Sequence, residues 1–244
     1  MSQYLHLHTS SDYQSVSATA TNFILDELPH KPDLLLCVAS GSSPLGAYRG
    51  LAKACAQNPD LFARLRILKL DEWGPLPAEH PGSCEYYVQR ELIGPLHITP
   101  DRYLTIPGDA PEPEAACRRY AEVLDASGPI DLCVLGLGLN GHLGLNEPAD
   151  WLCDTVHVAE LAEESKAHPM LQAGSPAALS PSYGLTLGMG DILRSRKILL
   201  IVSGASKRVP LQQFLTRQIS TRFPASLLWI HSDVTLLSDR DAHQ

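Results

Sequence analysis

Residues 136–150, GLGLNGHLGLNEPAD, place a histidine, a glutamate and two asparagines among closely spaced glycines. Histidine is a common proton carrier in enzymes, so His142 could move protons to and from a bound ligand, with Glu147 nearby in the chain. The first three glycines of this stretch also fit the G-x-G-x-x-G pattern of a dinucleotide-binding turn. The stretch therefore offers two kinds of chemistry, which are proton transfer by side chains and nucleotide binding by a glycine-rich backbone.

The nucleotide interpretation requires a helix that begins at the glycines and points its N-terminus at the pyrophosphate. Pro148 follows Gly141 after seven residues, and Gly144 lies between them, so a long helix cannot begin cleanly here. We therefore expect a loop whose glycines allow tight turns, so that His142 and Glu147 face a common ligand. A purely structural histidine is the alternative.

A segment of small residues lies between an apolar run and a helical pattern, and it consists of Ser40, Gly41, Ser42, Ser43 and Pro44. Small residues at such a junction expose backbone N–H groups, and a proline suits the first turn of a helix, where its missing N–H costs nothing. The N-terminus of a helix favours an anion, so the segment is a candidate phosphate site. An ordinary strand-to-helix turn capped by a serine is the alternative.

Carboxylates and a lysine follow two other apolar runs. Asp71 and Glu72 are adjacent, and neighbouring residues of a strand point to opposite sides. One carboxylate can therefore enter a cleft as a general base while the other turns away, for example to an ion pair. Lys207 ends the segment SGASK, and its ammonium could reach a phosphate. A turn or cap role for the acids and a solvated surface position for Lys207 are the alternatives.

Short apolar runs alternate with helical patterns along the chain, which predicts a parallel sheet covered on both faces. The predicted strands are 34–39, 67–70, 130–135, 198–202 and 227–230, and the clearest predicted helices are 45–54, 112–126 and 209–216. We interpret residues 1–244 as a single α/β domain with a doubly wound, mainly parallel, Rossmann-like sheet. Ligands of such sheets bind outside the carboxyl ends of the strands, so the polar segments that follow four of these runs should meet at one cleft.

The composition narrows the kinds of partner. A formal net charge of -8 over 244 residues disfavours a nucleic-acid-binding surface. No apolar run approaches the roughly 20 residues that cross a membrane, and the N-terminus does not resemble a secretory signal. The six cysteines form no C-x-x-C pair, and His6-x-His8 fits an edge strand better than a metal site, so we expect no bound metal. The widely spaced cysteines also indicate that the protein works in a reducing cytoplasm.

The polar segments together resemble a known family. The chain resembles the superfamily of glucosamine-6-phosphate deaminases and 6-phosphogluconolactonases in three segments, which are LDEW (70–73), GLGLNGHLGLNEP (136–148) and SGASK (203–207). The N-E-P ending resembles the deaminase branch of that superfamily. PGSCE (81–85) and PASLLWIHS (224–232) look most like the galactosamine-6-phosphate isomerase/deaminase group.

This resemblance implies chemistry on a hexosamine 6-phosphate without a metal or another cofactor. Asp71 would take the C2 proton of the sugar and return it at C1, and His142 would assist ring opening, helped by Glu147 and Asn140. The products would be a ketose 6-phosphate and ammonia, with tagatose 6-phosphate formed from the galacto sugar. The implied substrate-binding residues are Ser40, Gly41, Ser42, Ser43, Gly136 and Lys207.

Two departures from the deaminase pattern stand out. Asn140 occupies a position that usually carries aspartate, and an amide has no charge to stabilise an imidazolium. We therefore expect His142 to be less basic and Glu147 to carry more of the proton traffic. Glucosamine deaminases also supply an arginine to the phosphate from the segment after N-E-P, where this chain offers Lys166 and His168.

Three other functions compete with a galactosamine-6-phosphate deaminase. The glucosamine epimer is the nearest, because no residue of the sequence identifies a contact to the sugar's position 4. A lactonase needs only a water activated by histidine, but N-E-P and Asp71 disfavour it. A sugar-phosphate sensor without catalytic activity is disfavoured because no basic DNA-binding segment is present. The oligomeric state stays open, and a homo-oligomer is compatible with the sequence.

Overall fold

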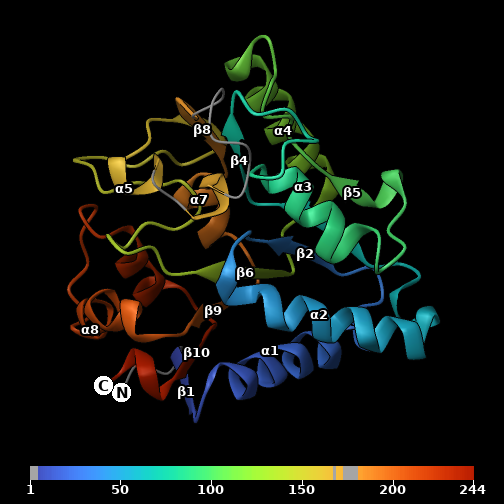
Figure 1. The fold of residues 1–244 in the computed structure, drawn as a ribbon. Helices are drawn as coiled ribbons and strands as arrows, with labels where there is room; N and C mark the ends of the chain where they lie inside the picture. The colour runs from blue at the N-terminus through green and yellow to red at the C-terminus, as the bar shows by residue number, and fades with distance from the viewer. Residues whose placement is uncertain (1–4, 167–168, 173–180) are drawn as a thin grey trace.

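The computed structural model describes residues 5–166, 169–172 and 181–244, and it has an α/β architecture. Seven parallel strands form the central sheet in the order β1-β10-β9-β6-β2-β3-β5. Figure 1 shows this sheet among the surrounding helices. The strands are β1 (Leu5–Ser10), β2 (Leu35–Val38), β3 (Arg66–Lys69), β5 (Tyr103–Leu104), β6 (Leu132–Gly136), β9 (Lys197–Val202) and β10 (Val234–Asp239). The predicted fold class is therefore confirmed.

Helices cover both faces of this sheet, because its inner strands are apolar on both sides. In β2, Leu36 and Val38 pack with helices α1 (Tyr13–Glu27) and α2 (Ser42–Gln57). Leu35 and Cys37 face the opposite side, toward α4 (Pro113–Ser127), α7 (Met189–Leu193) and α8 (Arg208–Leu215). The predicted helices at 45–54, 112–126 and 209–216 correspond to α2, α4 and α8.

A second, antiparallel sheet was not predicted from the sequence. Its strands are β4 (Asp71–Gly74), β8 (Tyr183–Thr186) and β7 (His157–Ala159), in that order. β4 follows β3 almost directly, so the chain leaves the central sheet at Leu70 and enters the small one at Asp71. This change of sheet carries the candidate base beyond the end of the central strands.

One predicted strand is wrong. Residues 227–230 belong to a 3-10 helix, η5 (Pro224–Ile230), and the strand that ends the central sheet in chain order is β10 instead. Four apolar residues alone do not distinguish a strand from a buried helical turn, and Pro224 at the start favours the helix. Leu228 still packs in the core, so the run is buried as expected but with a different backbone.

Short elements complete the part of the chain that the structure describes. They are η1 (Pro59–Phe62), α3 (Cys84–Val88), η2 (Gln89–Ile93), η3 (Pro100–Arg102), α5 (Glu163–Lys166), α6 (Pro169–Gln172), η4 (Ala205–Lys207) and η6 (Arg240–Ala242). None of the helices in the described ranges is long and apolar enough to cross a membrane. His6 and His8 lie on the edge strand β1, as expected.

Candidate active site

A cavity of about 470 Å³ lies beyond the carboxyl ends of the central strands. The segments that follow β2, β3, β6 and β9 all contribute to its wall, so the expected convergence is what the structure shows. The candidate residues that line it are Ser40, Gly41, Ser42, Ser43, Asp71, Gly136, Asn140, His142 and Lys207. Glu147 reaches the site through its contact with His142.

The serine-rich turn presents a helix N-terminus to the cavity. α2 begins at Ser42, and its N-cap is Gly41 with φ of 113°, a conformation that favours glycine. No side chain caps this end, so the alternative of a serine cap does not hold. The first N–H groups of α2 thus have no capping side chain at the cavity wall, as an anion site requires.

Lys207 also lines the cavity and is half-buried rather than a solvated surface lysine. Its Nζ donates a hydrogen bond of 2.5 Å to the carbonyl of Leu137, which directs the ammonium along the loop. Burial lowers the pKa of Lys207. Lys166, in contrast, forms an exposed ion pair with Glu163, and His168 lies outside the described residues.

Asp71 is buried and has an unusual titration. Burial and the charge of the neighbouring Glu72 raise its pKa to about 6, although the Cys84 thiol, His142 and Lys69 oppose that rise. The thiol Sγ lies 3.6 Å from Asp71 Oδ1. A carboxylate with a pKa near neutrality is a stronger base than an ordinary aspartate and is matched to general acid–base work.

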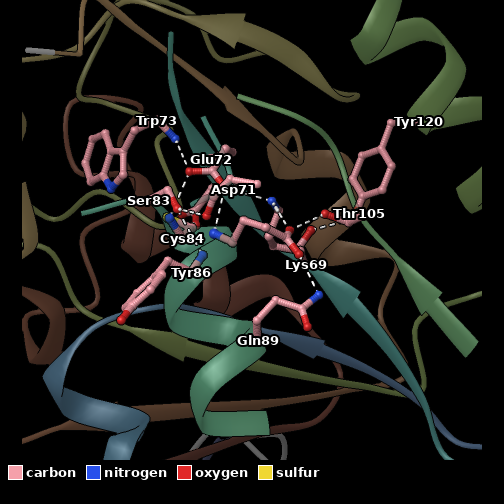
Figure 2. A network of polar contacts seen from close by, with 12 residues as sticks. Lys69, Asp71, Glu72, Trp73, Ser83, Cys84, Tyr86, Gln89, Thr105 and Tyr120 are labelled. Carbon is pink, nitrogen blue, oxygen red and sulfur yellow. Dashed lines mark hydrogen bonds and ion pairs between the residues drawn. The ribbon is translucent and has the colours of Figure 1, made fainter. Parts of the chain in front are cut away.

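Glu72 points away from the cavity into a buried ion-pair network, as the alternation along a strand predicts (Figure 2). Its Oε2 lies 2.7 Å from Lys69 Nζ, and the same Nζ lies 2.7 Å from Glu85 Oε2. Backbone N–H groups of Trp73, Cys84 and Glu85 donate to the Glu72 carboxylate. The network fixes β4 against the start of α3 directly behind the candidate base.

His142 and Glu147 face each other, with 3.4 Å between Nδ1 and Oε2. Burial would raise the pKa of Glu147, but His142 and hydrogen bonds from Ser165 and Asn140 lower it to about 2. Asn140 Nδ2 donates to Glu147 Oε2 at 2.8 Å, while its Oδ1 accepts from the backbone N–H of His142 at 3.1 Å.

These contacts bear on the roles expected of Asn140 and Glu147. The Asn140 amide oxygen accepts from the backbone of His142 and not from the imidazole, because the tight turn brings that N–H closest to it. Glu147 has too low a pKa to carry protons at neutral pH. It acts on the imidazole as a fixed negative charge.

The loop between 137 and 150 forms turns and no helix, which agrees with the rejection of a dinucleotide site. Gly141 and Gly144 adopt positive φ angles of 87° and 57°. A Cβ at Gly138 would lie 2.5 Å from the His142 ring, so only glycine leaves room for the imidazole. The glycines therefore serve to place His142.

Sequence reasoning missed two residues of the site. Cys84 lines the cavity beside Asp71, and its only signal was the PGSCE segment of the family resemblance. Ser165 lines the cavity and donates to Glu147 Oε1, and no local pattern singled it out. No group of His, Cys, Asp or Glu in the described residues has the arrangement of a metal site.

Fold and site define an α/β protein in which a buried carboxylate, a histidine and an uncapped helix N-terminus share one cavity. A model of the family of glucosamine-6-phosphate isomerases/6-phosphogluconolactonase matches residues 11–237, and the chain belongs to this family. It is 38% identical to "Putative deaminase AgaI" of Escherichia coli (strain K12), over 95% of this chain and 90% of that protein. It is 36% identical to glucosamine-6-phosphate deaminase 1 of Bacillus subtilis (strain 168), over 94% of this chain and 95% of that protein.

Solved structures agree with this assignment. A monomeric glucosamine-6-phosphate deaminase superposes with a TM-score of 0.89 at 34% identity, over 97% of this chain and 98% of the other. The 6-phosphogluconolactonase of Leishmania guyanensis superposes with a TM-score of 0.76 at 17% identity, over 98% and 97% of the two chains. The second likeness concerns the fold alone.

Proposed function

We propose that the protein converts an amino-sugar 6-phosphate into a ketose 6-phosphate and ammonia, with galactosamine 6-phosphate as the substrate and tagatose 6-phosphate as the product. The observation that carries the proposal is the shared cavity, in which Asp71 and His142 lie beside the Ser40–Ser43 turn and Lys207. Relatives named as glucosamine-6-phosphate deaminases support the reaction type.

His142 begins the reaction in this proposal by moving a proton between the ring oxygen and the anomeric hydroxyl, which opens the sugar. The charge of Glu147, held ionised by its low pKa, keeps the imidazole able to hold that proton. The helix N-terminus at Ser42 and the Lys207 ammonium bind the phosphate, and this remote binding positions C1 and C2.

Asp71 then takes the proton from C2, which gives an enolamine with a double bond between C1 and C2. Return of this proton to C1, with transfer of a proton from the amino nitrogen to O1, produces an imine at C2 and a primary alcohol at C1. Water adds to the imine carbon, the C–N bond breaks, and ammonia leaves a C2 ketone. The atoms balance as one amino-sugar phosphate and one water to one ketose phosphate and one ammonia.

The galacto configuration rests on the resemblance of LDEW, PGSCE and PASLLWIHS to the galactosamine group. Two of these segments lie at the site itself, because Asp71 and Cys84 both line the cavity. Glucosamine 6-phosphate is the second candidate, and the names of several relatives favour it. The two sugars differ only at C4.

Ammonia release from both sugar phosphates, measured side by side, tests the proposal. We expect a higher kcat/KM for galactosamine 6-phosphate and loss of activity with both sugars in Asp71→Asn. A preference for glucosamine 6-phosphate would overturn the galacto assignment and keep the reaction. Activity on neither sugar would overturn the reaction itself, and hydrolysis of 6-phosphogluconolactone would then be the next assay.

A further inference from the structure

The candidate base receives a side-chain hydrogen bond from a cysteine. Cys84 Sγ lies 3.6 Å from Asp71 Oδ1, which is within reach for a sulfur donor, and the thiol is 2% exposed. Both residues line the cavity. An ionised carboxylate can only accept hydrogen bonds, so the thiol is the donor of this pair.

Cys84 contacts both acids of the dipeptide, Asp71 and Glu72. Cys84 is the first residue of α3, and its backbone N–H donates to Glu72 Oε1 at 2.8 Å. Its side chain meets the neighbouring Asp71 instead. The Ser83 hydroxyl caps α3 by accepting from the Tyr86 N–H at 2.9 Å, which fixes the first turn (Figure 2). One helix start therefore holds both carboxylates of the dipeptide.

The second oxygen of Asp71 faces a different neighbour. A Cβ placed on Gly144, which lines the cavity, would lie 2.7 Å from Thr186 Oγ1 and 3.5 Å from Oδ2. The two oxygens thus differ, because Oδ1 accepts from the thiol and Oδ2 lies on the side of the cavity-lining Gly144. A carboxyl group that rotated freely would exchange these roles.

We propose that Cys84 is a positioning residue for the base, and that its thiol fixes the rotation of the Asp71 carboxyl group so that Oδ2 takes the substrate proton. The identity of that proton, on C2 of an amino-sugar phosphate, rests on the proposed function. The orientation of the carboxyl group rests on the contacts of the thiol and of Gly144 alone.

The groups around Asp71 give the direction of the effect. Glu72, its neighbour in β4, disfavours the ionised carboxylate, whereas Lys69 of β3, His142 of the central loop and the thiol of α3 favour it. Removal of the thiol therefore raises the pKa of Asp71 above about 6. Because S–H is a weak donor, we expect an increase of about 0.5 pH unit.

The direct test measures the titration of Asp71 without any substrate. The protein is labelled with [13Cγ]aspartate, the Asp71 signal is assigned by its loss in Asp71→Asn, and its pH titration is followed by NMR. Cys84→Ala should move the midpoint up by about 0.5 pH unit, while Cys84→Ser, which keeps a donor, stays closer to the wild type. Cys117→Ala is the matched control, since Cys117 is also buried, at 3% exposure, and lies in α4.

Kinetics of the same variants separate positioning from substrate contact. The acid limb of kcat/KM should move up in Cys84→Ala, with about a threefold loss at pH 5 and an unchanged KM. An unshifted NMR midpoint in Cys84→Ala would overturn the proposal, as would a rise in KM with an unchanged acid limb. A shifted midpoint in a protein that releases no ammonia would keep the positioning role and refute the proposed function.

Discussion

Lys69→Met is the most informative change behind the active site. Lys69 Nζ is fully buried between the carboxylates of Glu72 and Glu85, at 2.7 Å from each. Methionine nearly matches the length of lysine but carries no charge, so the substitution leaves two carboxylates with 1% and 12% exposed side chains facing each other.

Removal of one partner of a buried ion pair usually costs about 3–5 kcal/mol. Glu72 keeps its backbone donors, so we expect the lower end, a loss of about 3 kcal/mol in the free energy of unfolding at pH 7.5. Burial would raise the pKa of Glu85, but Lys69 lowers it below its ordinary value. This stabilisation is present above pH 4.5 and is lost as the pH falls through the lowered pKa of the folded state.

Urea unfolding at pH 7.5 and pH 5 measures both the loss and its pH dependence. In Lys69→Met the folded protein gains affinity for a proton, so its deficit relative to the wild type should shrink toward pH 5. Lys166→Met is the matched control: Lys166 and Glu163 are also three residues apart at 2.7 Å, but their side chains are 40% and 86% exposed. The control should lose at most about 0.5 kcal/mol. Equal losses in the two variants, or a Lys69→Met deficit that does not depend on pH, would refute the reasoning.

Three further predictions concern activity. Asp71 can act as a base only when it is ionised, so kcat/KM with the preferred sugar should fall as the pH drops below its pKa of about 6. A flat profile from pH 5 to 7 would contradict this role. Asn140→Asp removes the 2.8 Å donor to Glu147 and adds a like charge, so the pKa of Glu147 should rise and the pH profile of kcat/KM should change. An unchanged profile would count against this effect. Lys207→Met should raise KM at least about tenfold with a smaller change in kcat, and it should weaken competitive inhibition by inorganic phosphate; a fall in kcat alone would remove Lys207 from phosphate binding.

The sequence predicted strands β2, β3, β6 and β9 of the central sheet because they are apolar and buried on both faces, but it missed β1, β5 and β10. β2, β6 and β9 are continuous apolar runs followed directly by polar segments, and the carboxyl ends of parallel strands bring those segments to one edge. The candidate residues of the cavity could therefore be found before any coordinates.

The small sheet and its contacts could not be predicted, because they depend on pairing between distant residues. β4 pairs with β8 more than a hundred residues later in the chain, with Asp71 opposite Thr186. A strand of four residues is too short for its hydrophobic periodicity to predict this pairing. The strand predicted at 227–230 failed for a related reason, since burial alone does not specify the backbone. Ser165 and Cys84 reach the site through such tertiary contacts.

The adjacent acids Asp71 and Glu72 explain how one dipeptide supplies both a base and its support. The pleat sends Asp71 to the cavity and Glu72 to Lys69, so the negative charge of Glu72 remains close enough to raise the pKa of Asp71. A pKa of about 6 makes Asp71 a stronger base than a free aspartate, yet roughly nine-tenths of it is ionised at pH 7. If Lys69 were absent, the pKa of Asp71 would rise further and a smaller share of this carboxyl group would be ionised at neutral pH. The buried lysine therefore opposes part of the rise that burial and Glu72 create.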